Sequence, residues 1–154
     1  MATWNSDQIN ANSGLTTAQG QKVFPGPSVS GGLVMLRYSI TSTAAFNSAD
    51  VLNFGVAPKG FRALQYALES TDIDTNGSPT VTINVGDSGS ATRFFSAATV
   101  GQAGGVTNTI TTTGHDFQFT DDTLIVGAFA AGPATGAIGT IVFTMLGRFE
   151  GLAS

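Results

Sequence analysis

From Leu33 onward, apolar and polar residues alternate with a period of two, which is the pattern of half-buried β strands. In residues 33–41 the apolar side chains of Val34, Leu36, Tyr38 and Ile40 fall on one face. Further strands are predicted over 50–56 with Leu52, Phe54 and Val56 inward, 61–69 with Leu64, Tyr66 and Leu68 inward, and 80–85 with Val81, Ile83 and Val85 inward. Another apolar piece begins at Arg93-Phe94-Phe95, and the following residues 96–105 fit either a short helix or a loop.

Two later runs are apolar on both faces, Thr123–Ala131 and Ile138–Phe149. Strands of this kind lie in the middle of a sheet or under a neighbouring subunit. The Thr-rich run Val106–Thr113 fits an exposed edge strand, and Phe117 and Phe119 alternate with polar residues. About eight strands and no long amphipathic helix predict an all-β fold, a jelly-roll-like β-sandwich over residues 33–154.

Residues 1–32 have a different character, because apolar residues are sparse and the segment closes with PGPSVSGG. Pro25 and Pro27 disfavour helix, and Gly31–Gly32 provides a joint. We predict an extended N-terminal arm over 1–32. So polar a segment cannot recover its ordering entropy alone, at about 1–2 kcal/mol per residue. The segment is therefore expected to be either mobile or laid against a partner, with Trp4 and Phe24 as the expected partner-binding anchors.

Composition favours a surface that another subunit covers. Only 10% of residues are charged, against about 25% in an ordinary globular domain, and uncharged surface is cheap to desolvate. The alternative is a monomeric all-β protein with a Thr-rich surface. The six cations are scattered and the net charge is −4, so nucleic-acid binding is not expected. No apolar run approaches the ~20 residues of a membrane helix, and the start of the sequence has no secretory-signal pattern.

Catalytic chemistry has little support in this sequence. Gly86-Asp87-Ser88-Gly89 resembles the nucleophile motif of chymotrypsin-like proteases, but that family orders its triad His, Asp, Ser, and the single histidine, His115, follows Ser88. The absence of cysteine excludes thiolate chemistry and disulfides. A His115–Asp116 pair lacks further ligands for a transition metal. We predict no enzyme activity, no catalytic residues and no cofactor.

Asp72, Asp74 and Asn76 form a weak candidate cation site, because DIDTNG matches the opening of a calcium loop. Such a loop closes with a bidentate Glu at its twelfth position, which here is Ile83. Asn76-Gly77 is also a strong turn signal. The turn is the favoured interpretation, and the cation site stays open as the alternative.

Five segments together resemble small capsid-decoration or cement-type proteins of tailed bacteriophages. They are LRYSI (36–40), DVLNFGVAPKG (50–60), LESTDIDTNGSPTVTINVGD (68–87), RFFSAATVGQAGG (93–105) and TIVFTMLGRFEG (140–151). The resemblance covers roughly residues 33–151 and excludes the arm. It implies an all-β virion protein on the capsid exterior, made in the host cytoplasm. It also implies a homo-oligomer, often a trimer, that clamps the major capsid protein, and it lends no catalytic residue.

Two functions are therefore carried forward. The first is a non-enzymatic virion structural protein that decorates or cements a phage capsid, as an oligomer bound to coat subunits. The alternative is a receptor- or glycan-binding β-sandwich module of a phage fibre or tail component. Trp4, the single tryptophan, lies in the predicted arm, which argues against a preformed sugar-stacking platform in the sandwich.

Overall fold

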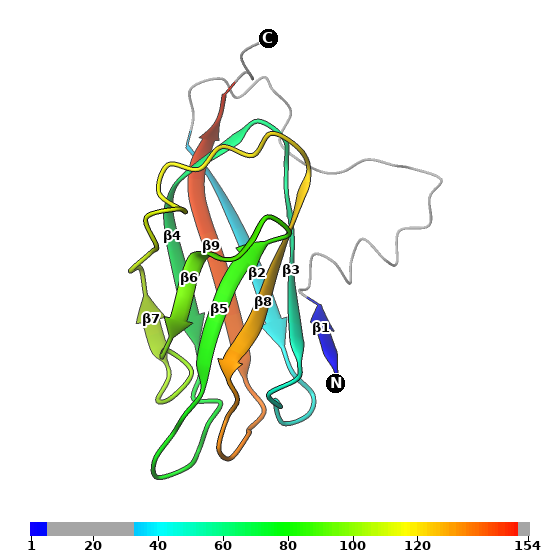
Figure 1. The fold of residues 1–154 in the computed structure, drawn as a ribbon, viewed down its shortest axis with the longest axis vertical. Coiled ribbons are helices and arrows are strands. Elements are labelled where there is room, and N and C mark those ends of the chain that lie inside the picture. Colours follow the sequence, from blue (N-terminus) through cyan, green and yellow to red (C-terminus); the bar gives the residue numbers. More distant parts are fainter. Residues whose placement is uncertain (6–32, 151–154) are drawn as a thin grey trace, which may run out of the picture.

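The computed structural model describes residues 1–5 and 33–150, and these form nine β strands and no helix (Figure 1). The strands are β1 Thr3–Asn5, β2 Val34–Thr41, β3 Val51–Ala57, β4 Phe61–Ser70, β5 Thr82–Asp87, β6 Ser90–Ala98, β7 Gly105–Thr107, β8 Thr123–Ala131 and β9 Thr140–Phe149. No helix in this part of the chain is long and apolar enough to cross a membrane.

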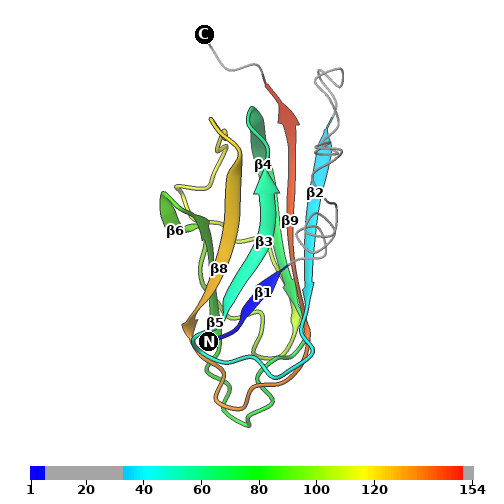
Figure 2. The same cartoon turned by 90° about the vertical axis from the view of Figure 1, so that its right-hand side faces the viewer.

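The strands form two sheets that pack face to face (Figure 2). The first sheet has the order β1-β3-β8-β5-β6 and the second has the order β2-β9-β4-β7. All the neighbours pair antiparallel except β1 and β3, which pair parallel. From β2 to β9 the chain crosses between the sheets at every step except the β5–β6 hairpin, which is the connectivity of a jelly roll. The predicted fold class is confirmed.

Inward side chains of both sheets meet in a core rich in aromatic rings. Phe143 of β9 lies at its centre and is fully buried. Its ring contacts five others at centroid distances of 5.5–6.4 Å, those of Tyr38, Phe54, Tyr66, Phe94 and Phe95. The strands that supply these rings come from both sheets, so Phe143 packs against side chains of both layers.

The predicted inward residues are confirmed for β2 and for residues 81–85. The prediction is wrong at two positions beside β-bulges. The register of β3 shifts between Asn53 and Gly55, so Ala57 is buried in place of the predicted Val56. The register of β4 shifts between Ala63 and Gln65, which leaves Leu64 only partly buried. A bulge adds one residue to one strand and reverses the alternation beyond it, which period-two reasoning does not anticipate.

The two strands predicted to be apolar on both faces, β8 and β9, lie mid-sheet as expected. The predicted edge strand at 106–113 is wrong in its length, because β7 ends at Thr107. The Thr111 N–H donates to the Phe94 carbonyl at 3.1 Å, and the Thr111 hydroxyl donates to the Arg93 carbonyl. These bonds draw the chain away from β4 and over β6. Of the stretch 96–105, residues 96–98 continue β6 and residues 100–103 form turns, so a strand end followed by a loop, and no helix, occupies it.

The first residues of the predicted arm belong to the sandwich. β1 pairs in parallel with β3, with Trp4 opposite Leu52. The Trp4 side chain packs on the core and meets the ring of Phe46 edge-on at 5.6 Å. The remainder of the arm, with Phe24, lies outside the described residues, so the domain boundary stays a prediction.

Candidate interaction surface

The outer face of the first sheet carries a band of uncharged side chains centred on β8. Alternation along β8 turns Ile125, Gly127 and Phe129 inward. Leu124, Val126, Ala128 and Ala130 face outward, and cross-strand partners share their face. Val51 of β3 and Asn84 of β5 flank Ala128, Asn53 flanks Val126, and Val56 flanks Leu124. We call the residues Val51, Asn53, Val56, Asn84, Leu124, Val126, Ala128 and Ala130 the β8 face.

The β8 face contains no Asp, Glu, Lys or Arg. Leu124 is 41% exposed, and Ala128 and Ala130 are also exposed. The six apolar side chains of this face lose little solvation free energy when covered, whereas the amides of Asn53 and Asn84 need hydrogen-bond partners in an interface. This surface can bind another protein through shape and apolar contact, and it offers no acid, base or nucleophile for chemistry.

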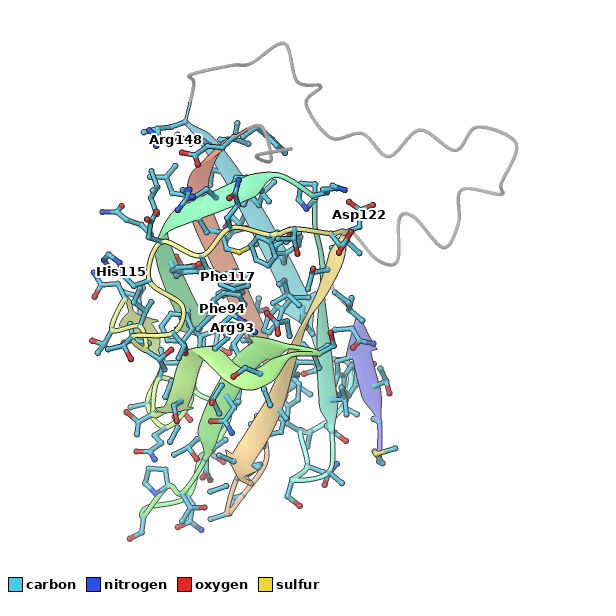
Figure 3. The ribbon with its side chains drawn as sticks, turned by 45° about the horizontal axis from the view of Figure 1, so that its top comes forward. Arg93, Phe94, His115, Phe117, Asp122 and Arg148 are labelled. Atoms are coloured by element: carbon cyan, nitrogen blue, oxygen red, sulfur yellow. The ribbon has the colours of Figure 1, made fainter. Side chains whose placement is uncertain are left out.

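The charged residues gather elsewhere. Arg62 pairs with Asp116 at 3.0 Å and with Glu150 at 2.5 Å, and Arg148 also pairs with Glu150 at 2.5 Å. These arginines, Arg62 first, hold the pKa of the Glu150 carboxyl below its ordinary value. Figure 3 shows Arg148 near the end of β9 and Asp122 beside the start of β8. This end of the sandwich is thus polar, while the β8 face at the middle of the first sheet is uncharged.

The protease-like motif Gly86-Asp87-Ser88-Gly89 covers the last two residues of β5 and the two-residue turn of the β5–β6 hairpin. Asp87 accepts the N–H groups of Gly89 and Ser90 at 2.8 and 2.9 Å and pairs with Arg93 at 2.5 Å. The Arg93 guanidinium lies over the Phe117 ring, 4.2 Å from its centroid (Figure 3). The Asp87 carboxylate thus holds a turn together. His115 is exposed on the loop between β7 and β8.

The Asp72–Asn76 loop is built around the buried carboxylate of Asp74, which is 1% exposed. Its two oxygens accept four backbone N–H groups, from Thr80 at 2.7 Å, Val81 at 3.1 Å, Ala134 at 3.0 Å and Thr135 at 2.8 Å. Burial alone would raise the pKa of Asp74, but these donors outweigh it and hold the pKa far below its ordinary value.

The other two residues of the candidate cation loop also take part in local bonding. Asp72 accepts the Asp74 N–H at 3.0 Å, and Asn76 accepts the Ser78 N–H at 2.9 Å. Among the described residues, no group of three or more His, Cys, Asp or Glu side chains is arranged to hold a metal. The arrangement favours the turn interpretation.

Asp50 is a second buried carboxylate, 2% exposed, that sequence reasoning did not single out. It accepts the Ala2 N–H at 2.8 Å, the Trp4 indole N–H at 2.9 Å and the Asn47 N–H at 3.1 Å. Burial raises the pKa of Asp50, and these donors, Trp4 foremost, lower it by more, so the pKa lies below its ordinary value. Trp4 is thereby an anchor within its own chain, and its predicted partner-binding role stays a prediction.

Fold and surface together define a jelly-roll protein with an uncharged face suited to binding other proteins. No family model and no curated protein matches the sequence. Two solved structures do. A chain of the cyanophage Pam1 capsid asymmetric unit is 33% identical with a TM-score of 0.70, and the match covers 89% of this chain and 99% of that chain. A chain of the capsid of Ralstonia phage GP4 is 31% identical with a TM-score of 0.74, covering 87% and 95%.

At this identity and coverage, the protein belongs to the same family as these two phage capsid chains. It is therefore a capsid-associated structural component of a bacteriophage virion. These relatives also point to a structural, non-enzymatic role.

Proposed function

We propose that the protein decorates or cements the exterior of a phage capsid, binding the major capsid protein as a homo-oligomer, most simply a trimer. The observation that carries this proposal is the uncharged β8 face at the middle of the first sheet. Its relatives come from two phage capsids, which supports a coat subunit as the partner. The β8 face is the surface that we assign to coat binding.

An uncharged face gives each copy modest affinity, because it supplies no charged hydrogen bonds to an interface. Linking several copies in one oligomer turns the later contacts into intramolecular ones, which raises the overall affinity by orders of magnitude. This mode of binding suits a lattice, which presents the same site repeatedly. It also accounts for a chain with only 10% charged residues. The fibre or tail module gains no comparable support, since both relatives come from capsids.

Binding to particles that lack the protein tests the proposal. Ala128→Glu places a carboxylate at the centre of the β8 face, where covering it would leave a desolvated charge. We expect particle occupancy at a fixed, subsaturating protein concentration to fall at least ten-fold, an affinity loss of roughly 1.4 kcal/mol or more for the whole oligomer. The matched control is Ala103→Glu, the same change at an exposed position in the loop before β7.

Melting temperatures of both variants equal to that of the unaltered protein would establish that the fold is unaffected. Full particle occupancy by the Ala128→Glu variant would rule out the β8 face as the coat-binding surface. Failure of the unaltered protein to bind any capsid shell would remove the decoration function itself.

A further inference from the structure

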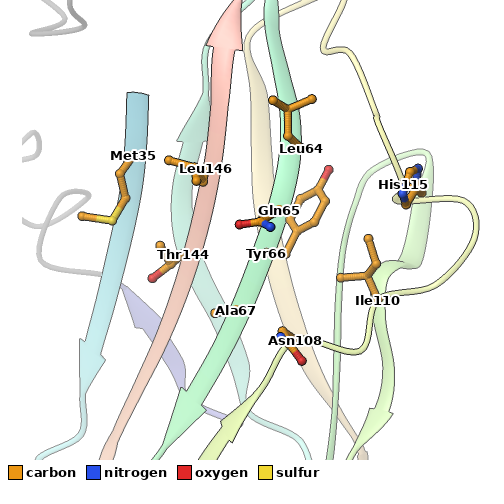
Figure 4. Close-up of a pocket in the computed structure, with 10 residues that line it drawn as sticks. All are labelled: Met35, Leu64, Gln65, Tyr66, Ala67, Asn108, Ile110, His115, Thr144 and Leu146. Carbon is orange, nitrogen blue, oxygen red and sulfur yellow. The ribbon is translucent and has the colours of Figure 1, made fainter. Parts of the chain in front are cut away.

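A groove of about 510 Å³ crosses the outer face of the second sheet and ends against the loop that follows β7 (Figure 4). Its apolar walls include Leu64 of β4, Ile110 of the loop and Leu146 of β9. Tyr66, Asn108 and His115 add polar groups at the loop side. The lining contains no Asp, Glu, Lys or Arg, so the groove suits an uncharged occupant that has both apolar and hydrogen-bonding groups.

The loop side of the groove coincides with a gap at the edge of β4. Beyond Leu68, β4 pairs with β7 through Ser70. At its other end it pairs with the loop, through the Arg62–Gln118 bridge and the Ala63 N–H, which donates to the Phe117 carbonyl at 3.0 Å. Residues 64–67 lie between these pairings and line the groove. A strand edge interrupted in this way is a site where an extended polypeptide adds by backbone pairing.

The hydroxyl of Tyr66 gives independent evidence of a missing partner. Tyr66 is 4% exposed, and its hydroxyl is the one buried side-chain polar atom in the described part of the chain that has no hydrogen-bond partner. Figure 4 shows this hydroxyl between Leu64 and His115. A buried hydroxyl without a hydrogen-bond partner destabilises the fold, and a main-chain carbonyl in the groove would accept its hydrogen bond.

Residues 6–32 have the composition that the groove requires. Asp7 and Lys22 are their only charged residues, and Val23-Phe24 is an apolar pair followed by Pro25 and Pro27, which favour extended backbone. Phe24 lies ten positions before Val34 at the start of β2, a span of up to about 35 Å. Phe24 can therefore reach well beyond the surface of its own sandwich.

The positions of the two ends of this segment indicate which molecule it reaches. It leaves β1 and returns at β2, which are the edges of the two sheets at one side of the sandwich (Figures 1 and 2). The open edge of β4 and the short β7 lie at the opposite edge of the second sheet. A contact between these two sides runs head to tail when it is repeated between copies, and head-to-tail contacts can close into rings.

We propose that the groove binds the Val23–Phe24 region of a second copy of this chain. In this proposal the Phe24 ring of the second copy enters between Leu64 and Ile110. The main chain of the same segment pairs with residues 64–67 of β4, and one of its carbonyls accepts a hydrogen bond from the Tyr66 hydroxyl. This proposal deepens the proposed function and rests on it, because it specifies how the copies of the homo-oligomer are joined.

The absence of cysteine in the chain permits a direct test by disulfide cross-linking. A Lys22→Cys/Asn108→Cys variant places one thiol beside Phe24 and one at the rim of the groove, where Asn108 is exposed. On oxidation of the purified protein without particles, we expect covalent multimers on a denaturing gel. They should form about ten-fold faster than in the control Lys22→Cys/Ala128→Cys, whose second thiol lies on the β8 face.

Two further substitutions in the cross-linking background test the mode of binding. Phe24→Ser should slow cross-linking to the rate of the control. Tyr66→Phe should also slow it, while leaving the melting temperature of the sandwich unchanged or higher, since the hydroxyl has no partner within the described part of its own chain.

A disulfide found only within single chains would overturn the proposal by placing the segment on its own groove. Cross-linking no faster than the control would overturn it as well. Either result leaves capsid binding by the β8 face intact, because that property is measured separately on particles. Loss of particle binding with intact cross-linking would instead count against the coat-binding function alone.

Discussion

The indole Nε1–H of Trp4 donates a hydrogen bond of 2.9 Å to Oδ2 of Asp50, across 46 residues of sequence. The same carboxylate accepts the backbone N–H groups of Ala2 and Asn47. It therefore fixes the start of the chain to the turn that precedes β3. The segment that follows β1 is held at both ends, by β1 on the first sheet and by β2 on the second.

Trp4→Phe should reduce the free energy of unfolding by about 1–2 kcal/mol, because it keeps an aromatic ring against Phe46 and removes a hydrogen bond to a charged acceptor. Urea unfolding at pH 7 would measure the change. The control is Thr3→Ala, which alters the exposed neighbouring position of the same strand. Equal stability of the two variants would show that the Trp4–Asp50 bond contributes nothing.

Deleting residues 1–30 should lower the melting temperature by several degrees, since it removes β1 and leaves the Asp50 carboxylate with one of its three donors. Replacing residues 8–30 with a short Gly/Ser linker keeps β1 and should leave the melting temperature within about 2 °C of the unaltered protein. The comparison by scanning calorimetry separates the strand from the segment behind it. Identical melting of both deletions would mean that β1 does not stabilise the sandwich.

The fold class could be predicted from alternation, because the inward residues of a half-buried strand are apolar and recur at every second position, as at Val81, Ile83 and Val85. The positions of Val56 and Leu64 did not follow. Each depends on a bulge, which is set by the partner strand and not by the local pattern. The uncharged run at β8 was visible in the sequence, but its grouping with Val51 and Asn84 required the register of three strands.

The roles of the two buried carboxylates, Asp50 and Asp74, also could not be predicted from the sequence. Asp74 lies in a motif that resembles a calcium loop, yet two of its four donors come from Ala134 and Thr135, about sixty residues away. Asp50 lies in no candidate catalytic or metal-binding motif of the sequence. Long-range donors of this kind become visible only when the loops at one end of the sandwich are brought together.

The lowered pKa values of Asp50 and Asp74 predict that the protein loses stability in acid. The folded pKa values of Asp50 and Asp74 lie below the ordinary value, which is about 3.9 in an unfolded chain. Between the folded and unfolded pKa values the unfolded state binds more protons, so the free energy of unfolding rises with pH in that window. The stabilisation is fully present above about pH 5 and is lost as the pH falls through 4 and below.

Melting temperatures measured from pH 7 to pH 2.5 would check this expectation, with a plateau down to about pH 5 and a steep fall below pH 4. Asp74→Asn should flatten the acid limb, because it removes a group that titrates differently in the two states. It should also lower the plateau, because an amide nitrogen cannot accept the N–H bonds that the carboxylate oxygens accept. An acid limb as steep in Asp74→Asn as in the unaltered protein would assign the acid sensitivity to other groups.

Gly127 tests the register that creates the β8 face. It lies on the inner side of β8, and a Cβ built there would be 2.8 Å from Cε2 of Phe54 and 3.1 Å from the side chain of Leu52. Gly127→Ala should therefore destabilise the fold by about 1–3 kcal/mol through overpacking. Ala128→Ser, one residue along and facing outward, should change stability by less than about 0.5 kcal/mol. Urea unfolding of both variants would measure the difference, and the reverse ranking would mean that β8 presents its other side to the core, with the uncharged face turned inward.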